Sequence, residues 1–210
     1  MRKIIIIGSG KMGESLARGF VKNYDVLIVG RNKDKLDALQ KRIEGLRIDT
    51  IDTLSEFGEA VVVLAVKPYD LVEVAKKIQN KPKLLISILA GTTIQTIREN
   101  IKADYYVRAM PNIASQYGKG MTALTGDEEF ANLTQELFRS IGKSLWLQTE
   151  NELDIATAVA GSGPAYLALV AEALIDGGVK SGLSRRDANI LVHGLFEGFV
   201  PLIEAQAPND

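Results

Sequence analysis

The sequence predicts an α/β fold in which a doubly wound, mostly parallel sheet is followed by an all-helical domain. Three observations support it: a glycine-rich turn after a β-branched strand, alternation of short apolar runs with amphipathic stretches, and the loss of strand-like runs near residue 150. Repeated strand–helix units favour a parallel sheet with helices on both faces. We therefore expect two domains, residues 1–150 and 151–210.

Strands are expected where short, continuous apolar runs lie between turn residues, as in strands buried on both faces. In chain order these runs are Ile4–Gly8, Val26–Val29, Val61–Val66, Leu84–Leu89, Tyr105–Ala109, Met121–Leu124 and Leu145–Leu147.

Helices are expected between these strands, where apolar residues recur with helical spacing. The stretches are Met12–Asn23, Asn32 to about Glu44, Tyr69–Gln79, Ile94–Ile101 and Glu128–Ile141. Asn32 is a residue type that caps helix starts, and Thr53-Leu54-Ser55-Glu56 has the pattern of a capping box.

The last third reads as helix throughout. Thr149-Glu150-Asn151-Glu152 is a second capping-box pattern, and Ser184 is a cap for the final helix. The expected helices are Leu153–Ala160, Pro164–Lys180 and Arg185–Ala205. Pro164–Leu174 is apolar nearly all round, which is typical of a helix buried on several sides, so a partner chain is its natural cover.

The amino-acid composition reduces the number of function classes that fit this chain. The net charge is -1 and the pI is about 6.0, which does not indicate a nucleic-acid or anionic-membrane surface. With no cysteine and one histidine, His193, a metal site or a catalytic triad is not expected, and His193 receives no role. The charge-free run Ile155–Ala171 is shorter than the roughly 20 residues of a membrane span. We expect a cytoplasmic protein that binds a small molecule.

Gly8-Ser9-Gly10-Lys11-Met12-Gly13 matches the dinucleotide-binding pattern G-x-G-x-x-G, directly after a buried strand and at the start of a helix. Gly8 permits the tight turn, Gly10 lets the backbone approach a pyrophosphate, and Gly13 permits close packing of helix and strand. The motif and its context predict a Rossmann domain. A glycine turn without a ligand is the alternative.

The end of the second strand bears on the choice of cofactor. NAD-binding domains usually carry an acidic residue about 20 residues after the glycine motif. Here Arg31, Asn32 and Lys33 occupy the strand end, and their cationic and polar groups suit a ribose 2′-phosphate. The sequence therefore favours NADP(H), with NAD(H) open and ordinary solvated side chains as the alternative.

Further strand ends are expected at the same edge of the sheet, where ligands bind in open α/β folds. They contribute Ala65-Val66-Lys67-Pro68, Ala90-Gly91 and Pro111-Asn112 as cofactor-binding candidates. Lys67 is equally compatible with a solvated loop lysine. In the helical domain, Gly161, Ser162 and Gly163 break two helices and are candidates for a kink beside the substrate.

Together these motifs resemble those of the pyrroline-5-carboxylate reductase family. The matching segments are Gly8–Glu14, Gly19-Phe20, Ala65–Pro68, Ala90-Gly91, Arg108–Asn112, Gly120–Leu124, Ala160–Tyr166, Glu172–Leu174, Asp176–Lys180 and Gly182-Leu183. Met110-Pro111-Asn112 followed by Gly161–Tyr166 is more specific than the glycine turn.

The resemblance implies reduction of the C=N bond of 1-pyrroline-5-carboxylate to L-proline by NAD(P)H. It also implies a homodimer formed through the helical domain, often assembled further. A protonated cyclic imine is already electrophilic, so positioning it against the nicotinamide supplies most of what the reaction needs.

Two departures stand out. The family usually continues Thr-Pro after the Pro-Asn pair, whereas this chain has Ile113-Ala114. The family's substrate-binding loop, a Ser/Thr-Pro-Gly-Gly-Thr-Thr segment, would lie beyond Asp210, so no catalytic residue is assigned and the helical domain is expected to be truncated.

Two other functions remain open. β-Hydroxyacid dehydrogenases share the plan of a Rossmann domain followed by helices, but they need a lysine with an asparagine one turn later, and Lys180 is followed by Ser184. The other is a non-catalytic NADP-binding protein.

Overall fold

The computed structural model describes residues 2–52, 57–78 and 80–206. The chain forms two compact units, Met1–Ser162 and Gly163–Asp210. The predicted capping box at residues 53–56 lies outside the described residues.

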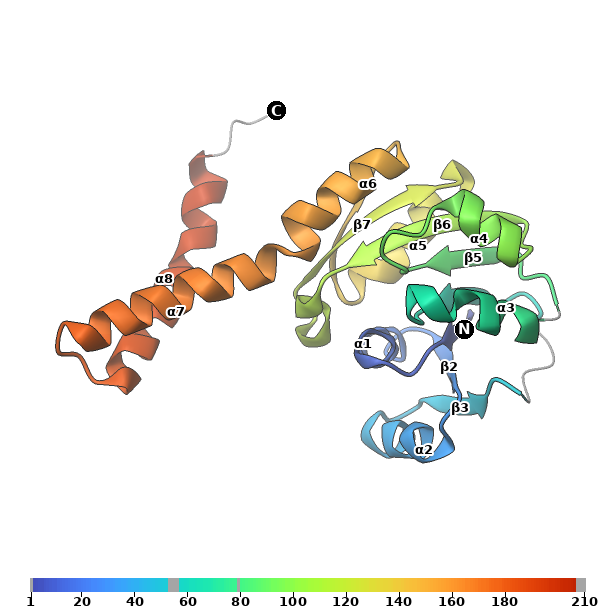
Figure 1. The fold of residues 1–210 in the computed structure, drawn as a ribbon, viewed down its shortest axis with the longest axis horizontal. Helices are drawn as coiled ribbons and strands as arrows, with labels where there is room; N and C mark the ends of the chain where they lie inside the picture. Colours follow the sequence, from blue (N-terminus) through green and yellow to red (C-terminus); the bar gives the residue numbers. More distant parts are fainter. Residues whose placement is uncertain (1, 53–56, 79, 207–210) are drawn as a thin grey trace. The chain divides into compact units, whose positions relative to one another are not determined.

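An eight-stranded sheet organises the first unit (Figure 1), in the order β3-β2-β1-β4-β5-β6-β7-β8. The strands are β1 (Lys3–Ile7), β2 (Asp25–Gly30), β3 (Arg47–Thr50), β4 (Val61–Leu64), β5 (Leu84–Ser87), β6 (Tyr105–Pro111), β7 (Gly120–Gly126) and β8 (Gly142–Trp146). All neighbours pair in parallel except β6 and β7, which are antiparallel. The predicted doubly wound, mostly parallel sheet is confirmed.

Helices cover both faces of this sheet. They are α1 (Lys11–Phe20), α2 (Lys33–Arg42), α3 (Leu71–Lys77), α4 (Ile94–Asn100), α5 (Ala131–Arg139) and α6 (Glu150–Ala156). Successive residues of a strand point to opposite faces. Accordingly Ile4 and Ile6 of β1 pack in one core with α1, α2 and α5, while Ile5 and Ile7 pack in the other with α3 and α4.

Capping patterns place several helix starts as expected. The Asn32 side chain accepts a hydrogen bond from the Lys35 backbone N–H at 2.8 Å. Thr149 and Glu152 form the reciprocal capping box of α6, and the Ser184 hydroxyl accepts from the Asp187 N–H at 3.0 Å. These local signals succeed because they depend on residues only three positions apart.

The structure adds elements that the apolar pattern did not indicate. Strand β3 is short and incompletely buried, so it lacks the continuous apolar run used to recognise strands. A 3₁₀ turn covers Ile113–Tyr117, and a π-helical turn over Thr157–Gly161 continues α6.

The first unit extends beyond the expected boundary at residue 150, because α6 and the π turn bond to the sheet. The buried guanidinium of Arg108 on β6 binds Glu150 at 2.8 Å and Asp154 at 3.1 Å. Glu150 also accepts a hydrogen bond from the Ile94 N–H at the start of α4, at 2.9 Å. Strand β6 and the start of α4 are thereby both bonded to α6.

The second unit consists of α7 (Gly163–Lys180) and α8 (Arg185–Gln206). Its buried core among the described residues is Ile175, Ala188 and Val192. The exposed large apolar side chains of these two helices and their connection are Tyr166, Leu167, Leu169, Val170, Leu174, Leu183, Ile190, Leu191, Leu195, Phe199, Val200, Leu202 and Ile203. So much exposed apolar surface on a small core is typical of a unit that is covered by something else.

Candidate functional site

The glycine turn after β1 is built by backbone contacts. Gly8 has φ +123°, and a Cβ there would lie 2.4 Å from the Ala65 carbonyl oxygen. A Cβ on Gly13 would lie 2.0 Å from the Gly8 carbonyl oxygen. These two glycines are therefore required by the close approach of β1, β4 and α1.

Gly10 differs from both neighbours, because a Cβ there would meet no atom within 4 Å. It is the N-cap of α1 and makes no side-chain cap. The first helical bond runs from the Glu14 N–H to the Gly10 carbonyl at 2.9 Å. The N–H groups of Lys11, Met12 and Gly13 thus have no acceptor within the helix, and the positive end of the helix dipole adds to them. This arrangement suits a phosphate group.

A cleft of about 1150 Å³ opens beside this turn at the carboxyl edge of the sheet. That volume is slightly above the roughly 300–1,000 Å³ usual for small-molecule sites, as an extended ligand requires. The buried Ser15 hydroxyl lines the cleft and has no hydrogen-bond partner in the described part of the chain. The open space at Gly10, the free N–H groups and the cleft volume fit a dinucleotide.

Many of the sequence-predicted residues line this cleft. They are Gly8, Ser9, Gly10, Lys11, Met12, Arg31, Ala65, Val66, Lys67, Pro68, Ala90 and Pro111. They come from the ends of β1, β2, β4, β5 and β6, which meet because the strands are parallel.

Other predicted residues lie outside the cleft lining and have identifiable local contacts. Gly13 packs against Gly8, and Asn32 caps α2. The Lys33 ammonium binds Asp37 at 3.0 Å, one turn along α2. Gly91 supplies a turn with φ +64°. A cofactor contact for these residues stays a prediction.

Asn112 was also predicted to contact the cofactor, yet its side chain is engaged within the protein. Its Nδ2 donates to the Ala160 carbonyl at 3.0 Å, and its Oδ1 accepts from the N–H groups of Ala114 and Met121 at 3.2 and 3.3 Å. The side chain joins β6, the following 3₁₀ turn, β7 and the π turn. A contact to the nicotinamide likewise stays a prediction.

The glycine-rich break lies at the end of the first unit. A Cβ on Gly161 would approach the Thr157 methyl at 3.3 Å and the Met110 side chain at 3.9 Å, and Met110 lines the cleft. Ser162 is the last residue of the first unit and Gly163 begins α7. Their expected place beside a substrate stays a prediction.

The cleft lining also contains charged residues that sequence reasoning missed, among them Asp70, Lys35 and Arg18. Arg31 Nη1 and Nη2 donate to Asp70 Oδ1 and Oδ2, each at 3.4 Å, and Nη1 lies 3.6 Å from Glu73 Oε2. Lys35, on the first turn of α2, lines the cleft, as does Arg18 of α1. Lys33 and Asp37 have the spacing of a helical ion pair, which was the available signal that the Lys33 charge is already used.

Titrating groups with shifted pKa values lie elsewhere. Burial raises the pKa of Tyr24, and hydrogen bonds donated to Asp104 and Glu129 raise the pKa values of Lys81 and Tyr105, respectively. None of these three residues lines the cleft, so their shifts do not mark a proton-transfer group in it.

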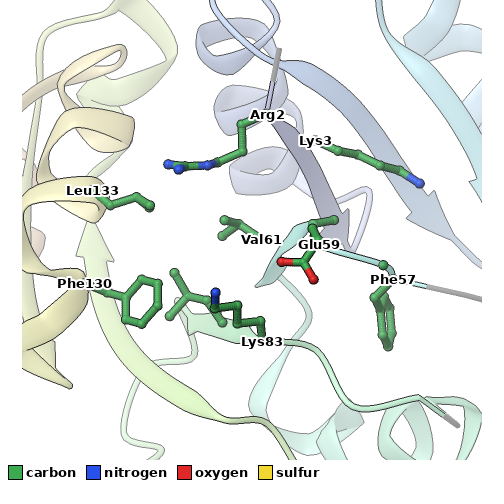
Figure 2. A pocket seen from close by; sticks show the side chains of 11 residues that line it. Arg2, Lys3, Phe57, Glu59, Val61, Lys83, Phe130 and Leu133 are labelled. Carbon is green, nitrogen blue, oxygen red and sulfur yellow. The ribbon is translucent and has the colours of Figure 1, made fainter.

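A second hollow of about 560 Å³ lies at the opposite edge, near the amino ends of β1, β4 and β5 (Figure 2). Arg2, Lys3 and Lys83 line it, together with Glu59 and an apolar wall. Figure 2 shows the charged ends of Arg2 and Lys3 pointing in opposite directions. Because these charges do not converge, the carboxyl-edge cleft is the stronger candidate for function.

Comparisons with known proteins identify the relatives of this chain. Residues 3–91 match the family described as NADP oxidoreductase, coenzyme F420-dependent. Residues 150–210 match the pyrroline-5-carboxylate reductase dimerisation family. A pyrroline-5-carboxylate reductase of Glycine max is 37% identical over 191 residues, which are 85% of this chain and 69% of the relative. The chain belongs to the pyrroline-5-carboxylate reductase family.

Solved structures of this family agree with the assignment. A pyrroline-5-carboxylate reductase from Coxiella burnetii is 29% identical with a TM-score of 0.85, over 99% of this chain and 81% of that one. A Plasmodium falciparum pyrroline carboxylate reductase with NADP bound is 30% identical with a TM-score of 0.80, over 97% and 79% of the two chains. The predicted family resemblance is therefore confirmed.

Proposed function

We propose that this protein reduces 1-pyrroline-5-carboxylate to L-proline with NADP(H), the last step of proline biosynthesis. The observation that carries the proposal is the open Gly10 turn at the start of α1, facing a large cleft in a member of this reductase family. The Plasmodium falciparum relative contains NADP, which supports the same cofactor here. NAD(H) is the alternative electron donor.

Different residues along the cleft contact different parts of the cofactor. The N–H groups at the start of α1 bind the pyrophosphate, and Arg31 and Lys35 lie at the end of the cleft where β2 stops. At the other strand ends, Ala90 and Pro111 supply a neutral wall.

When bound, the nicotinamide supplies a hydride to the imine carbon, and the imine nitrogen becomes an amine. The chain contributes mainly position and orientation, which are the larger part of catalysis for an already electrophilic imine. We assign no acid or base to the step.

The helical unit provides the dimerisation surface. Residues 150–210 match a dimerisation family, and α7 and α8 expose most of their large apolar side chains. Two helical spans, Glu150–Lys180 and Arg185–Ala205, are long enough to cross a membrane, and their most apolar stretches of 18 residues have mean hydropathies of 1.5 and 1.2. The dimerisation match favours a second copy of the chain as the cover, in a cytoplasmic homodimer that can assemble further.

The test combines a binding titration with two turnover assays. The fluorescence of NADPH should change on binding and should saturate as protein is added. The absorbance of NADPH should fall when 1-pyrroline-5-carboxylate is added, because the reaction oxidises it. NADP⁺-dependent oxidation of β-hydroxyacids, without imine reduction, would instead indicate the dehydrogenase alternative. Tight NADPH binding without turnover of either substrate would indicate a non-catalytic NADP-binding protein.

A further inference from the structure

Arg31, the cation expected to bind a 2′-phosphate, is already paired with carboxylates. Both of its terminal nitrogens donate to Asp70, each at 3.4 Å, and Glu73 lies 3.6 Å away. The Asp70 side chain is 15% exposed, whereas those of Arg31 and Glu73 are 56% and 58% exposed. Asp70 is thus the more enclosed of the two carboxylates that hold the guanidinium.

The backbone fixes the place of Asp70. It ends the 3₁₀ turn Pro68–Asp70, and its N–H donates to the Lys67 carbonyl at 2.9 Å. Since β2 and β4 both flank β1, the turn after β4 faces the residue after β2 across the carboxyl edge of the sheet. The long, half-exposed Arg31 side chain is the partner that can move.

Both Arg31 and Asp70 line the cleft beside the end of β2, where an adenosine ribose lies in Rossmann domains. A 2′-phosphate carries more than one negative charge at neutral pH, with a second pKa of about 6. To bind Arg31, the 2′-phosphate must displace the carboxylates of Asp70 and Glu73 or share the guanidinium with them. Any carboxylate that remains beside Arg31 repels the phosphate. The neutral 2′-hydroxyl of NADH has no such conflict.

Lys35 provides a contrasting cation in the same cleft. No ion pair or hydrogen bond of its ammonium group is found among residues 2–52, 57–78 and 80–206. A 2′-phosphate can therefore reach the charge of Lys35 without displacing a described carboxylate.

We propose that Asp70, assisted by Glu73, sets the cofactor selectivity by competing with the 2′-phosphate for Arg31. In the cofactor-free protein Asp70 neutralises this cation, which lowers the affinity for NADPH relative to NADH. This inference rests on the proposed function, because it concerns the selectivity of the same cofactor site.

The test is the substitution Asp70→Asn in the full chain, with NADPH and NADH titrated separately. Asp70 makes no helix-capping hydrogen bond, so the variant should fold, as circular dichroism can verify. NADPH binding should tighten about fivefold, the upper range for a partly exposed ion pair, while NADH binding changes less than about twofold. Glu73→Gln should produce the same change at smaller size, because Glu73 is more exposed.

Asp25→Asn is the matched control, since Asp25 pairs with Arg47 at 3.0 Å away from the cleft and should affect neither cofactor. In the double variant Arg31→Ala, Asp70→Asn, the gain from Asp70→Asn should shrink. Weaker NADPH binding in Asp70→Asn would overturn the inference, because Asp70 would then orient Arg31 for the phosphate. Equal changes for both cofactors would overturn it as well. The proposed function fails separately, if the unmodified chain neither binds NADPH nor reduces the imine.

Discussion

Asn112 donates a hydrogen bond from Nδ2 to the carbonyl oxygen of Ala160, 48 positions later and 3.0 Å away. The residue after β6 thereby holds the π turn that ends in Gly161. Single π turns in helices often accompany functional sites. The bond thus links the strand end beside Pro111, which lines the cleft, to the glycine-rich break that follows α6.

Replacing Asn112 with aspartate should destabilise the protein by about 1–3 kcal/mol, because a nearly buried carboxylate would face the Ala160 carbonyl in place of a donor. The affinity for NADPH should stay close to that of the unmodified chain. Urea unfolding and NADPH titration measure the two quantities. Normal stability with lost NADPH affinity would instead favour the sequence-based prediction of a direct contact.

The sequence was sufficient for the glycine turn and for the seven strands that have continuous apolar runs, because these depend on local signals, whereas the short strand β3 was missed. A β-branched run followed by Gly8, Gly10 and Gly13 indicates a strand, a turn and a helix within a few residues. The pairing of Arg31 with Asp70 joins residues 39 positions apart, and no local pattern indicates it. Likewise, the role of Asn112 depends on where Ala160 comes to lie after the chain has folded.

Lysine positions on the first turn of α2 provide a paired test. Lys35 lines the cleft, whereas Lys33 is bound to Asp37 at 3.0 Å. Lys35→Ala should weaken NADPH binding by about 1 kcal/mol, as expected for an exposed charge contact, with little effect on NADH. Lys33→Ala is the control and should leave both affinities nearly unchanged. A larger loss for Lys33→Ala would show that its side chain leaves Asp37 when the cofactor binds.

Two glycines of the turn should respond differently to substitution. Gly10→Val should abolish dinucleotide binding while the fold is retained, because its side chain enters the open space over the N–H groups of α1. Gly13→Ala should instead lower the melting temperature, since a Cβ would lie 2.0 Å from the Gly8 carbonyl oxygen. Calorimetry and NADPH titration separate the effects. Undiminished NADPH binding by a folded Gly10→Val variant would show that the turn binds no cofactor.

The buried Arg108 predicts unequal effects at its two acidic partners. Glu150→Ala should cost about 3 kcal/mol of stability, because it removes the nearer partner of a guanidinium that is 1% exposed and also the acceptor of the Ile94 N–H. Asp154→Ala should cost less than about 1 kcal/mol, because the Asp154 side chain is 58% exposed. Denaturant unfolding of both variants is the measurement, and equal losses would contradict this ranking.

The helical unit yields the prediction with the widest consequence. Leu169 on α7 and Leu195 on α8 are 68% and 54% exposed, and the described core of this unit contains only three buried residues. If a second copy covers these helices, a charge placed among them is desolvated in the dimer and destabilises it. Leu169→Glu combined with Leu195→Glu should therefore shift the sedimentation of the protein from dimer, or a multiple of it, towards monomer.

Glu172→Gln, on the same helix as Leu169, is the control and should keep the assembly intact. NADPH affinity should survive in the monomer, because every residue that lines the cleft belongs to the first unit. An unmodified chain that sediments as a monomer in detergent-free buffer would contradict the homodimer, and its recovery with lipid vesicles would identify a membrane as the cover instead.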